Sequence, residues 1–234
     1  MRFEIQEVSE KQKNRGAGRV TRGGRVMKKK KAFFISVEGL EGSGKSSVII
    51  FLKELLEKQG RQVKVFREPG STIIGEQIRN VLLDRKNSEL SKHTELLLYL
   101  AARTQLIEEK LAAAFKSFDV VICDRFFDST LAYQGYAMGL GSICEKSVKM
   151  FSLGVTPDLT LLLDMPVEEG LNRIPEKDRV ESRPIEFHQK LRKGFQLLAR
   201  KNNRRIKIID ARGTLKDIFE RVEKVIKERL PASK

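Results

Sequence analysis

One eight-residue stretch, residues 39–46, restricts the possible fold more than any other feature of this chain. It reads Gly-Leu-Glu-Gly-Ser-Gly-Lys-Ser and matches the pattern G-x-x-x-x-G-K-[ST]. A strand-like apolar run precedes it at residues 31–38, and residues 47–58 after it carry apolar side chains at helical spacing. In this context the glycines let backbone N–H groups surround an anion, and the helix N-terminus adds its positive end. The stretch predicts a nucleoside triphosphate site, with Lys45 on the β- and γ-phosphates and Ser46 on Mg²⁺.

Strand-like and helix-like segments alternate along the rest of the chain. The predicted strands lie at residues 33–37, 63–67, 120–124, 159–164 and 206–209. The predicted helices lie at residues 46–59, 74–83, 91–115, 129–138, 144–153, 166–173, 184–201 and 215–229. This alternation predicts one α/β domain, a doubly wound five-stranded parallel sheet with helices on both faces. Because ligands of such sheets bind beyond the carboxyl ends of the strands, the informative residues should follow each strand.

The charge of the chain is concentrated at its N-terminus. The 234 residues carry a net charge of +15, and residues 1–31 hold 11 Lys and Arg against 3 Glu. This basic extension is rich in glycine, poor in apolar side chains and predicted to be disordered, with the folded domain spanning residues 32–234. A nucleic-acid-binding arm or a targeting segment is the alternative, although Glu4, Glu7 and Glu10 argue against targeting. The rest of the chain is moderately basic, which suits phosphate substrates and requires no nucleic acid.

Cysteine usage and hydropathy both indicate a cytoplasmic protein. Cys123 and Cys144 form no CxxC pair, and Cys123 lies inside an apolar strand, which indicates a buried, reduced thiol. No apolar stretch is long enough to span a membrane, and the N-terminus lacks the apolar middle region of a secretory signal. His93 and His188 have no matched partners in the sequence, so both are interpreted as structural or exposed.

Charged side chains follow two of the predicted strands. Arg67 ends the second strand before a Pro-Gly turn, where a second anionic ligand could be met. The third strand ends in Asp124 and Arg125. A carboxylate in this place is how phosphate-loop enzymes hold Mg²⁺, usually through water. The adjacent guanidinium offers a two-pronged hydrogen-bond donor for a phosphate.

Two further segments carry weaker signals. Tyr99 and Arg103 lie four residues apart and therefore share one helix face, where they could stack on a base and bind its edge. Residues 173–183 hold several cations between two predicted helices, with Pro175 and Pro184 as helix breakers. A short, cationic segment of this kind fits a lid that closes over a triphosphate and expels water.

Taken together, these segments resemble the thymidylate kinases of bacteria, from about residue 32 to the C-terminus. A phosphate loop alone occurs in many enzymes, whereas the whole ordered series is specific to this family. The matching segments are Val37-Glu-Gly-Leu-Glu-Gly-Ser-Gly-Lys-Ser46, Arg67-Glu-Pro-Gly70, Tyr99-Leu-Ala-Ala-Arg103, Asp124-Arg125 with Ser129, Ala132-Tyr-Gln-Gly135, Pro157-Asp-Leu-Thr-Leu-Leu-Leu-Asp164 and Asp178-Arg-Val-Glu181.

The resemblance implies the P-loop NTPase fold with a short lid, and transfer of the γ-phosphoryl of ATP to dTMP with Mg²⁺, in dTTP biosynthesis. It also implies a homodimer packed through long helices. The implied catalytic residues are Lys45, Arg125, Glu41 and Arg173, and the implied metal residues are Ser46 and Asp124. The implied ATP site comprises Gly39, Leu40, Glu41, Gly42, Ser43, Gly44, Lys45, Ser46, Ser47, Arg173, Lys177 and Arg179. The implied dTMP site comprises Glu41, Arg67, Tyr99, Arg103, Arg125, Ser129, Thr130, Tyr133 and Gln134.

Within the dTMP site the resemblance assigns separate roles. Tyr99 would stack on thymine and Arg103 would bind its edge, with Thr130 and Gln134 nearby. Tyr133 would lie near C2′ of the sugar, Glu41 would hold the 3′-hydroxyl end, and Arg67 and Arg125 would hold the 5′-phosphate.

The chain departs from the family pattern at a few positions. Some members carry an arginine inside the phosphate loop, and residues 40–43 here include no cation. The lid should therefore supply the cation, from Arg173, Lys177 or Arg179. The usual second glycine after Glu-Pro is replaced by Ser71, and Phe126 stands where tyrosine is common.

Three other functions were weighed. Another nucleoside monophosphate kinase is the nearest alternative, and relative activity on dTMP, dUMP, dCMP and dGMP distinguishes it. A GTPase-type switch would need an Asn-Lys-x-Asp segment, which the sequence lacks. The third alternative is a nucleic-acid-binding protein that acts through its basic extension. Removing residues 1–26 should abolish binding in that case, whereas it should leave the activity of a thymidylate kinase untouched.

Overall fold

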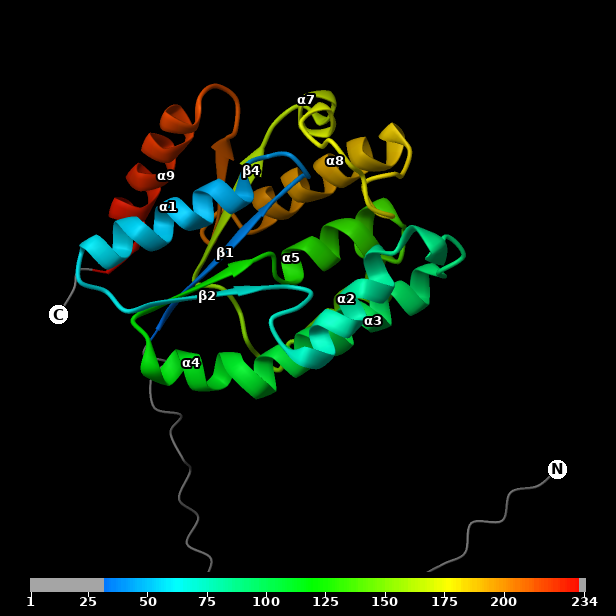
Figure 1. Cartoon of the computed structure of the whole chain (residues 1–234), viewed down its shortest axis with the longest axis horizontal. Helices are drawn as coiled ribbons and strands as arrows, with labels where there is room; N and C mark the ends of the chain where they lie inside the picture. Colours follow the sequence, from blue (N-terminus) through cyan, green and yellow to red (C-terminus); the bar gives the residue numbers. More distant parts are fainter. Residues whose placement is uncertain (1–31, 232–234) are drawn as a thin grey trace, which may run out of the picture.

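Five short apolar strands form one sheet in which all neighbouring strands are parallel. The strands are β1 (Phe33–Gly39), β2 (Val63–Arg67), β3 (Val120–Asp124), β4 (Leu159–Asp164) and β5 (Ile206–Asp210), in the spatial order β2-β3-β1-β4-β5. The computed structural model describes residues 32–231, and Figure 1 shows this sheet between layers of helices. The predicted doubly wound five-stranded sheet is confirmed.

The order of the strands determines where a ligand can bind. β1 lies between β3 and β4, so the chain leaves β1 toward one face and leaves β3 toward the other. A crevice therefore opens between the carboxyl ends of β1 and β3, as expected at the switch point of a doubly wound sheet. In the register of the sheet, Val37 of β1 pairs with Asp124 of β3, and Asp124 pairs with Arg67 of β2.

Alternating side chains of the strands build a core on each face. Ile35, Val37 and Ile122 pack against α1 (Lys45–Lys58) and α9 (Leu215–Arg229). Phe34, Val121 and Cys123 point the other way, toward η2 (Ile107–Leu111) and α4 (Ala112–Ser117). α8 (Ile185–Lys201) covers the β4–β5 side of that second face, through Leu191 and Phe195 among others. The core is thus apolar on both faces, as parallel sheets require.

The remaining helices frame the carboxyl ends of the strands. They are α2 (Ile73–Leu83), η1 (Arg85–Asn87), α3 (Lys92–Leu106), α5 (Phe127–Thr130), η3 (Leu131–Ala137), α6 (Gly141–Phe151) and α7 (Val167–Asn172). Most agree with the predicted helices to within a few residues. η1 was not predicted, and the single helix predicted at residues 91–115 is α3 and α4 joined by the π-helical turn η2. The helix predicted at residues 129–138 begins as α5 and is mostly the π-helical η3.

Several expectations from the sequence concern cysteines and the chain ends. Cys123 and Cys144 are free and buried, as predicted for Cys123. The basic extension at residues 1–31 lies outside the described residues. Across residues 32–231, no helix has both the length and the hydropathy needed to cross a membrane.

Candidate active site

The phosphate loop, residues 39–46, joins β1 to α1 as predicted. Gly44 adopts the left-handed region at φ 90°, and α1 begins at the next residue without a side-chain cap. The first N–H groups of α1 are therefore directed into the loop, where an anion can accept their hydrogen bonds. The Lys45 Nζ donates to the main-chain oxygens of Gly39 at 3.3 Å and Leu40 at 2.7 Å. Burial and the nearby Arg125 lower the pKa of Lys45 to about 8.

Gly42 is the residue of the loop that tolerates a side chain least. Its φ is +71°, and a Cβ there would lie 2.1 Å from the main-chain oxygen of Gly170 in α7. We expect Gly42→Ala to lower the free energy of unfolding by about 1–3 kcal/mol more than Gly60→Ala does. Gly60 is the matched control because its φ is +77° and a Cβ there meets nothing within 4 Å. Urea unfolding of both variants measures the difference, and equal losses would contradict the close packing of the loop on α7.

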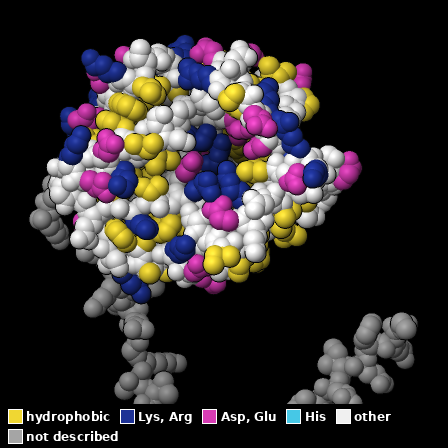
Figure 2. All heavy atoms as spheres, viewed as in Figure 1, with side chains coloured by type: hydrophobic (Ala, Val, Ile, Leu, Met, Phe, Trp, Pro, Cys, Tyr) yellow, Lys and Arg dark blue, Asp and Glu magenta, His cyan; other side chains and the backbone are white. Residues whose placement is uncertain are grey.

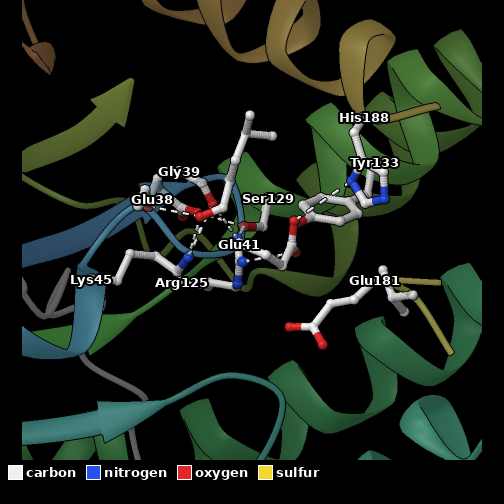
Figure 3. Close-up of polar contacts among 12 residues, drawn as sticks. Glu38, Gly39, Glu41, Lys45, Arg125, Ser129, Tyr133, Glu181 and His188 are labelled. Atoms are coloured by element: carbon white, nitrogen blue, oxygen red, sulfur yellow. Dashed lines mark hydrogen bonds and ion pairs between the residues drawn. The ribbon is translucent and has the colours of Figure 1, made fainter. Parts of the chain in front are cut away.

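Arg125 connects the phosphate loop to the crevice. It follows β3 directly and adopts φ 65°, which turns the chain sharply toward α5. Its Nη1 donates to the Gly39 oxygen at 2.9 Å and to Ser129 Oγ at 3.1 Å, and its Nη2 lies 3.1 Å from Glu41 Oε1. Figure 3 shows these contacts around the guanidinium. The Arg125 guanidinium therefore contacts both the phosphate loop and the first turn after β3.

Glu41 extends from the phosphate loop into the same crevice. Its Oε1 accepts hydrogen bonds from Arg125 and from the Tyr133 hydroxyl. Burial by itself would raise the pKa of the Glu41 carboxyl, but Arg125 and Lys45 outweigh it and hold the pKa below its usual range. Glu41 is therefore a carboxylate at neutral pH, with its charge balanced by two cations.

A second carboxyl group, which is fully buried, helps to hold this arrangement in place. Glu38 of β1 accepts hydrogen bonds from the Phe126 N–H at 2.7 Å and from Ser129 Oγ at 2.5 Å. Burial and the charge of Asp128 raise the pKa of Glu38 to about 8. Because Ser129 also accepts from Arg125, Glu38 helps to fix the position of that arginine.

A partly open cavity extends from Glu41 and Arg125 toward α3 and η3. Figure 2 shows a hollow in this view of the surface in which Lys and Arg side chains gather. Eight of the nine residues predicted for the dTMP site line the cavity: Glu41, Tyr99, Arg103, Arg125, Ser129, Thr130, Tyr133 and Gln134. Its wall also contains Glu68, Pro69, Arg79, Phe126, Asp178 and Glu181.

Arg103 lines this cavity and is almost fully buried, with a side chain only 1% exposed. Its Nη2 is 2.5 Å from Glu68 Oε1 and donates to Thr130 Oγ1 at 2.7 Å, and the guanidinium lies over the Phe126 ring. Within residues 32–231, its Nε and Nη1 are buried and have no hydrogen-bond partner. Burying such donors is costly unless something accepts from them, so they favour a ligand with carbonyl groups in the cavity.

A buried acidic residue ties the lid to α3. Glu95 is fully buried, and its Oε2 lies 2.7 Å from Arg179 Nη2 and 2.6 Å from Arg183 Nη2. Its Oε1 accepts from Gln134 Nε2 at 2.8 Å. Arg179 lies between Asp178 and Val180, which line the cavity, and its Nε also donates to the Leu82 oxygen. Its predicted contact with ATP stays a prediction.

The other predicted site residues lie around the phosphate loop. Arg173 donates to the Gly42 oxygen at 3.3 Å, whereas Lys177 is held through its main-chain oxygen by Arg85. Arg67 does not line the acceptor cavity. It forms two hydrogen bonds with Glu76 and shares a separate, shallow depression with Ser46 and Asp124. This depression brings together the two residues predicted to hold Mg²⁺.

Sequence reasoning assigned no role to several residues that shape the site: Glu38, Glu68, Arg79, Glu95 and His188. One signal for Glu95 was available, because it precedes Tyr99 and Arg103 at intervals of four on the same helix face. The others meet their partners only through the tertiary fold. His188 is buried, and its Nδ1 lies 3.8 Å from Glu41 Oε2.

Three features of the site define a class of protein. They are a phosphate loop, a cation shared between that loop and a second cavity, and a buried arginine that lies over an aromatic ring. They are the parts of a P-loop phosphotransferase that places two phosphorylated substrates side by side. Comparison with known proteins narrows the class. Residues 37–222 match the family model described as thymidylate kinase.

Comparison with individual proteins identifies the same family. A thymidylate kinase of Bacillus pumilus is 43% identical over 203 residues, which covers 84% of this chain and 96% of that protein. One from Syntrophotalea carbinolica is 45% identical over 201 residues, covering 82% and 93%. The crystal structure of a thymidylate kinase from Ehrlichia chaffeensis superposes with a TM-score of 0.69 at 31% identity, covering 84% of this chain and 98% of that one.

The chain belongs to the thymidylate kinase family. Members of this family are nucleoside monophosphate kinases that phosphorylate dTMP with ATP, and the chain is an enzyme of this kind.

Proposed function

We propose that dTMP binds in the cavity between Arg125 and Arg103, with its phosphate at Arg125 and its base at Arg103. The observation that carries this proposal is the position of Arg125, whose two nitrogens reach the Gly39 oxygen and Glu41. An acceptor phosphate held there lies next to the loop that holds the donor phosphates. The cavity on the far side of Arg125 is the place for the nucleoside.

The residues of the cavity match the groups of dTMP one by one. Among the residues that the structure describes, the Nε and Nη1 of Arg103 have no hydrogen-bond partner. Both would donate to a carbonyl of thymine. Tyr99 would stack on the base, and Thr130 and Gln134 would lie at its edge. The Tyr133 ring would occupy the space of a ribose 2′-hydroxyl, and Glu41 would accept from the 3′-hydroxyl.

The chemistry requires little beyond electrostatics and alignment. The acceptor phosphate is largely a dianion near neutral pH, because its second pKa is about 6, so no strong general base is needed. The enzyme must instead bring two anions together in line and stabilise the charge that develops between them. Arg125 and Lys45 supply fixed cations on the acceptor and donor sides. Arg173, beside Gly42, is the lid cation nearest to the loop, and Lys177 and Arg179 would join it on closure.

Ser46 and Asp124 fit a magnesium ion. They share one depression, and the buried Asp124 Oδ1 has no hydrogen-bond partner among residues 32–231. No group of three or more His, Cys, Asp or Glu side chains in the described part of the chain could hold a metal alone. This suits Mg²⁺, which proteins commonly hold through one or two carboxylates, waters and substrate phosphates. When bound, the ion would offset charge on the donor phosphates.

Two further proposals concern assembly and location. A homodimer is supported by large apolar side chains that are exposed on three packed helices: Ile73, Ile74 and Val81 on α2, Leu97 on α3, and Ile143, Met150 and Phe151 on α6. A cytoplasmic location is supported by the two free cysteines.

A coupled ADP-release assay tests the assignment of the acceptor. With ATP and Mg²⁺, we expect kcat/KM for dTMP to exceed that for dCMP and dGMP by at least about 10³-fold, because a polar pocket left with unpaired donors rejects a mismatched base strongly. dUMP lacks only the methyl group of dTMP, so its kcat/KM should be about tenfold lower. A larger kcat/KM for dCMP or dGMP would contradict the proposed contacts of Tyr99 and Arg103. Removing Mg²⁺ with EDTA should stop turnover.

A further inference from the structure

His188 lies in the first turn of α8, where the lid meets the body of the domain. Its side chain is 1% exposed and stands edge-on to Phe187 at 5.4 Å. Within residues 32–231, neither ring nitrogen has a hydrogen bond of regular geometry. Buried imidazoles normally hydrogen-bond through at least one nitrogen, so this one calls for a partner.

Among the described residues, the side chain that could be that partner is Glu41, which also lacks a hydrogen bond on one oxygen. Its Oε1 is already bonded to Arg125 and Tyr133, whereas its buried Oε2 has no hydrogen bond in the described chain. His188 Nδ1 is 3.8 Å from that Oε2, which is too long for a hydrogen bond but needs a shift of less than about 1 Å to become one. Figure 3 shows the imidazole and the carboxylate facing each other past the Tyr133 ring.

The surroundings of His188 connect it to the lid as well. The groups that act on its ring are the Glu41 carboxylate, the main chain of Glu181 and Arg183 through weak hydrogen bonds, and the Arg183 guanidinium. Burial lowers the pKa of His188, so the ring is neutral and carries one N–H. The imidazole therefore lies between the lid and a carboxylate of the phosphate loop, with one proton to donate.

We propose that His188 is a positioning residue for the acceptor nucleotide: in the substrate complex its Nδ1–H donates to Glu41 Oε2 and orients that carboxylate toward the 3′-hydroxyl. The proposal rests on the proposed role of Glu41 toward the sugar. His188 does not touch the acceptor, and it acts through the carboxylate alone. A residue that only packed the lid against the loop would have no effect specific to the 3′-hydroxyl.

The test compares dTMP with its 3′-deoxy analogue, using kcat/KM with saturating ATP. The quantity measured is the ratio of the two values, because a general loss of packing lowers both values and leaves the ratio unchanged. We expect His188→Leu to reduce this ratio about tenfold, the effect of one hydrogen bond to a charged group. An unchanged ratio in His188→Leu would overturn the proposal.

Two polar variants identify the nitrogen involved. The amide nitrogen of His188→Asn takes the place of Nδ1, and that of His188→Gln takes the place of Nε2. We expect the asparagine variant to keep most of the ratio and the glutamine variant to lose it. The reverse order would overturn the assignment to Nδ1, and this comparison stands even if the leucine variant fails to fold.

Glu41→Gln separates this proposal from the proposed function. If the unaltered enzyme and Glu41→Gln show the same ratio, Glu41 does not read the 3′-hydroxyl, and both proposals are wrong. If Glu41→Gln lowers the ratio while His188→Leu does not, only the role of His188 is wrong. In the Glu41→Gln background, His188→Leu should cause little further loss, as coupled residues do.

Discussion

Arg125→Ala should lower kcat/KM for dTMP by about 10³-fold or more, the range reported for arginines that stabilise a transferring phosphoryl group. The variant loses the cation that lies against the Gly39 oxygen and Glu41, where the proposed acceptor phosphate would meet the phosphate loop. It also leaves the buried Glu41 with Lys45 as its remaining cation, which raises the cost of bringing a phosphate dianion nearby. Steady-state kinetics with varied dTMP at saturating ATP measures the effect.

Two controls separate charge, geometry and fold for this arginine. Arg125→Lys keeps a charge but loses the planar pair of donors, so its activity should lie between those of the alanine variant and the unaltered enzyme. Lys53→Ala removes an exposed cation of α1 that pairs with Glu57, and should leave kcat/KM within about twofold. A loss of less than tenfold in Arg125→Ala would contradict the placement of the acceptor phosphate.

Glu95→Ala should lower the free energy of unfolding by about 3 kcal/mol. The variant leaves Arg179 and Arg183 without their buried counterion and removes the acceptor of the Gln134 amide. The loss should fall at the lower end of the range for buried pairs, because the arginine side chains are 8% and 16% exposed and water can reach them in part. Urea unfolding at one fixed protein concentration measures it.

The matched control for Glu95 is an exposed ion pair. Glu223→Ala removes a carboxylate that pairs with Lys227 one turn away on α9, where the lysine side chain is exposed and the glutamate side chain is partly exposed. We expect a change of less than about 0.5 kcal/mol there. If Glu95→Ala is as stable as Glu223→Ala, the lid arginines find equally good partners elsewhere, and Glu95 does not hold the lid.

The strands and the residues that follow them could be predicted because their signals are local. Apolar runs ending in Gly39, Arg67 and Asp124 define strands, and the parallel topology then brings their carboxyl ends together. The π-helical turns η2 and η3 were missed, because one extra residue in a turn hardly alters the spacing of apolar side chains.

The missed parts of the site depend on contacts between distant segments. Glu68 and Arg103 are 35 positions apart, and His188 meets Glu41 across most of the chain. Nothing in the local pattern marks such pairs. Arg67 illustrates the opposite case: its position after a strand suggested a phosphate contact, whereas in this structure Glu76 from α2 binds it. Its predicted role toward dTMP stays a prediction.

Glu41 contributes to both the phosphate loop and the cavity, because its main chain forms part of the loop and its side chain lines the cavity. A shift of the loop when a ligand fills one site should therefore change the position of Glu41 in the other site. Thermodynamic linkage makes this influence reciprocal: whatever factor the donor nucleotide applies to the affinity for the acceptor, the acceptor applies to the affinity for the donor. With dTMP bound as proposed, the two substrates would act as each other's effectors through Glu41.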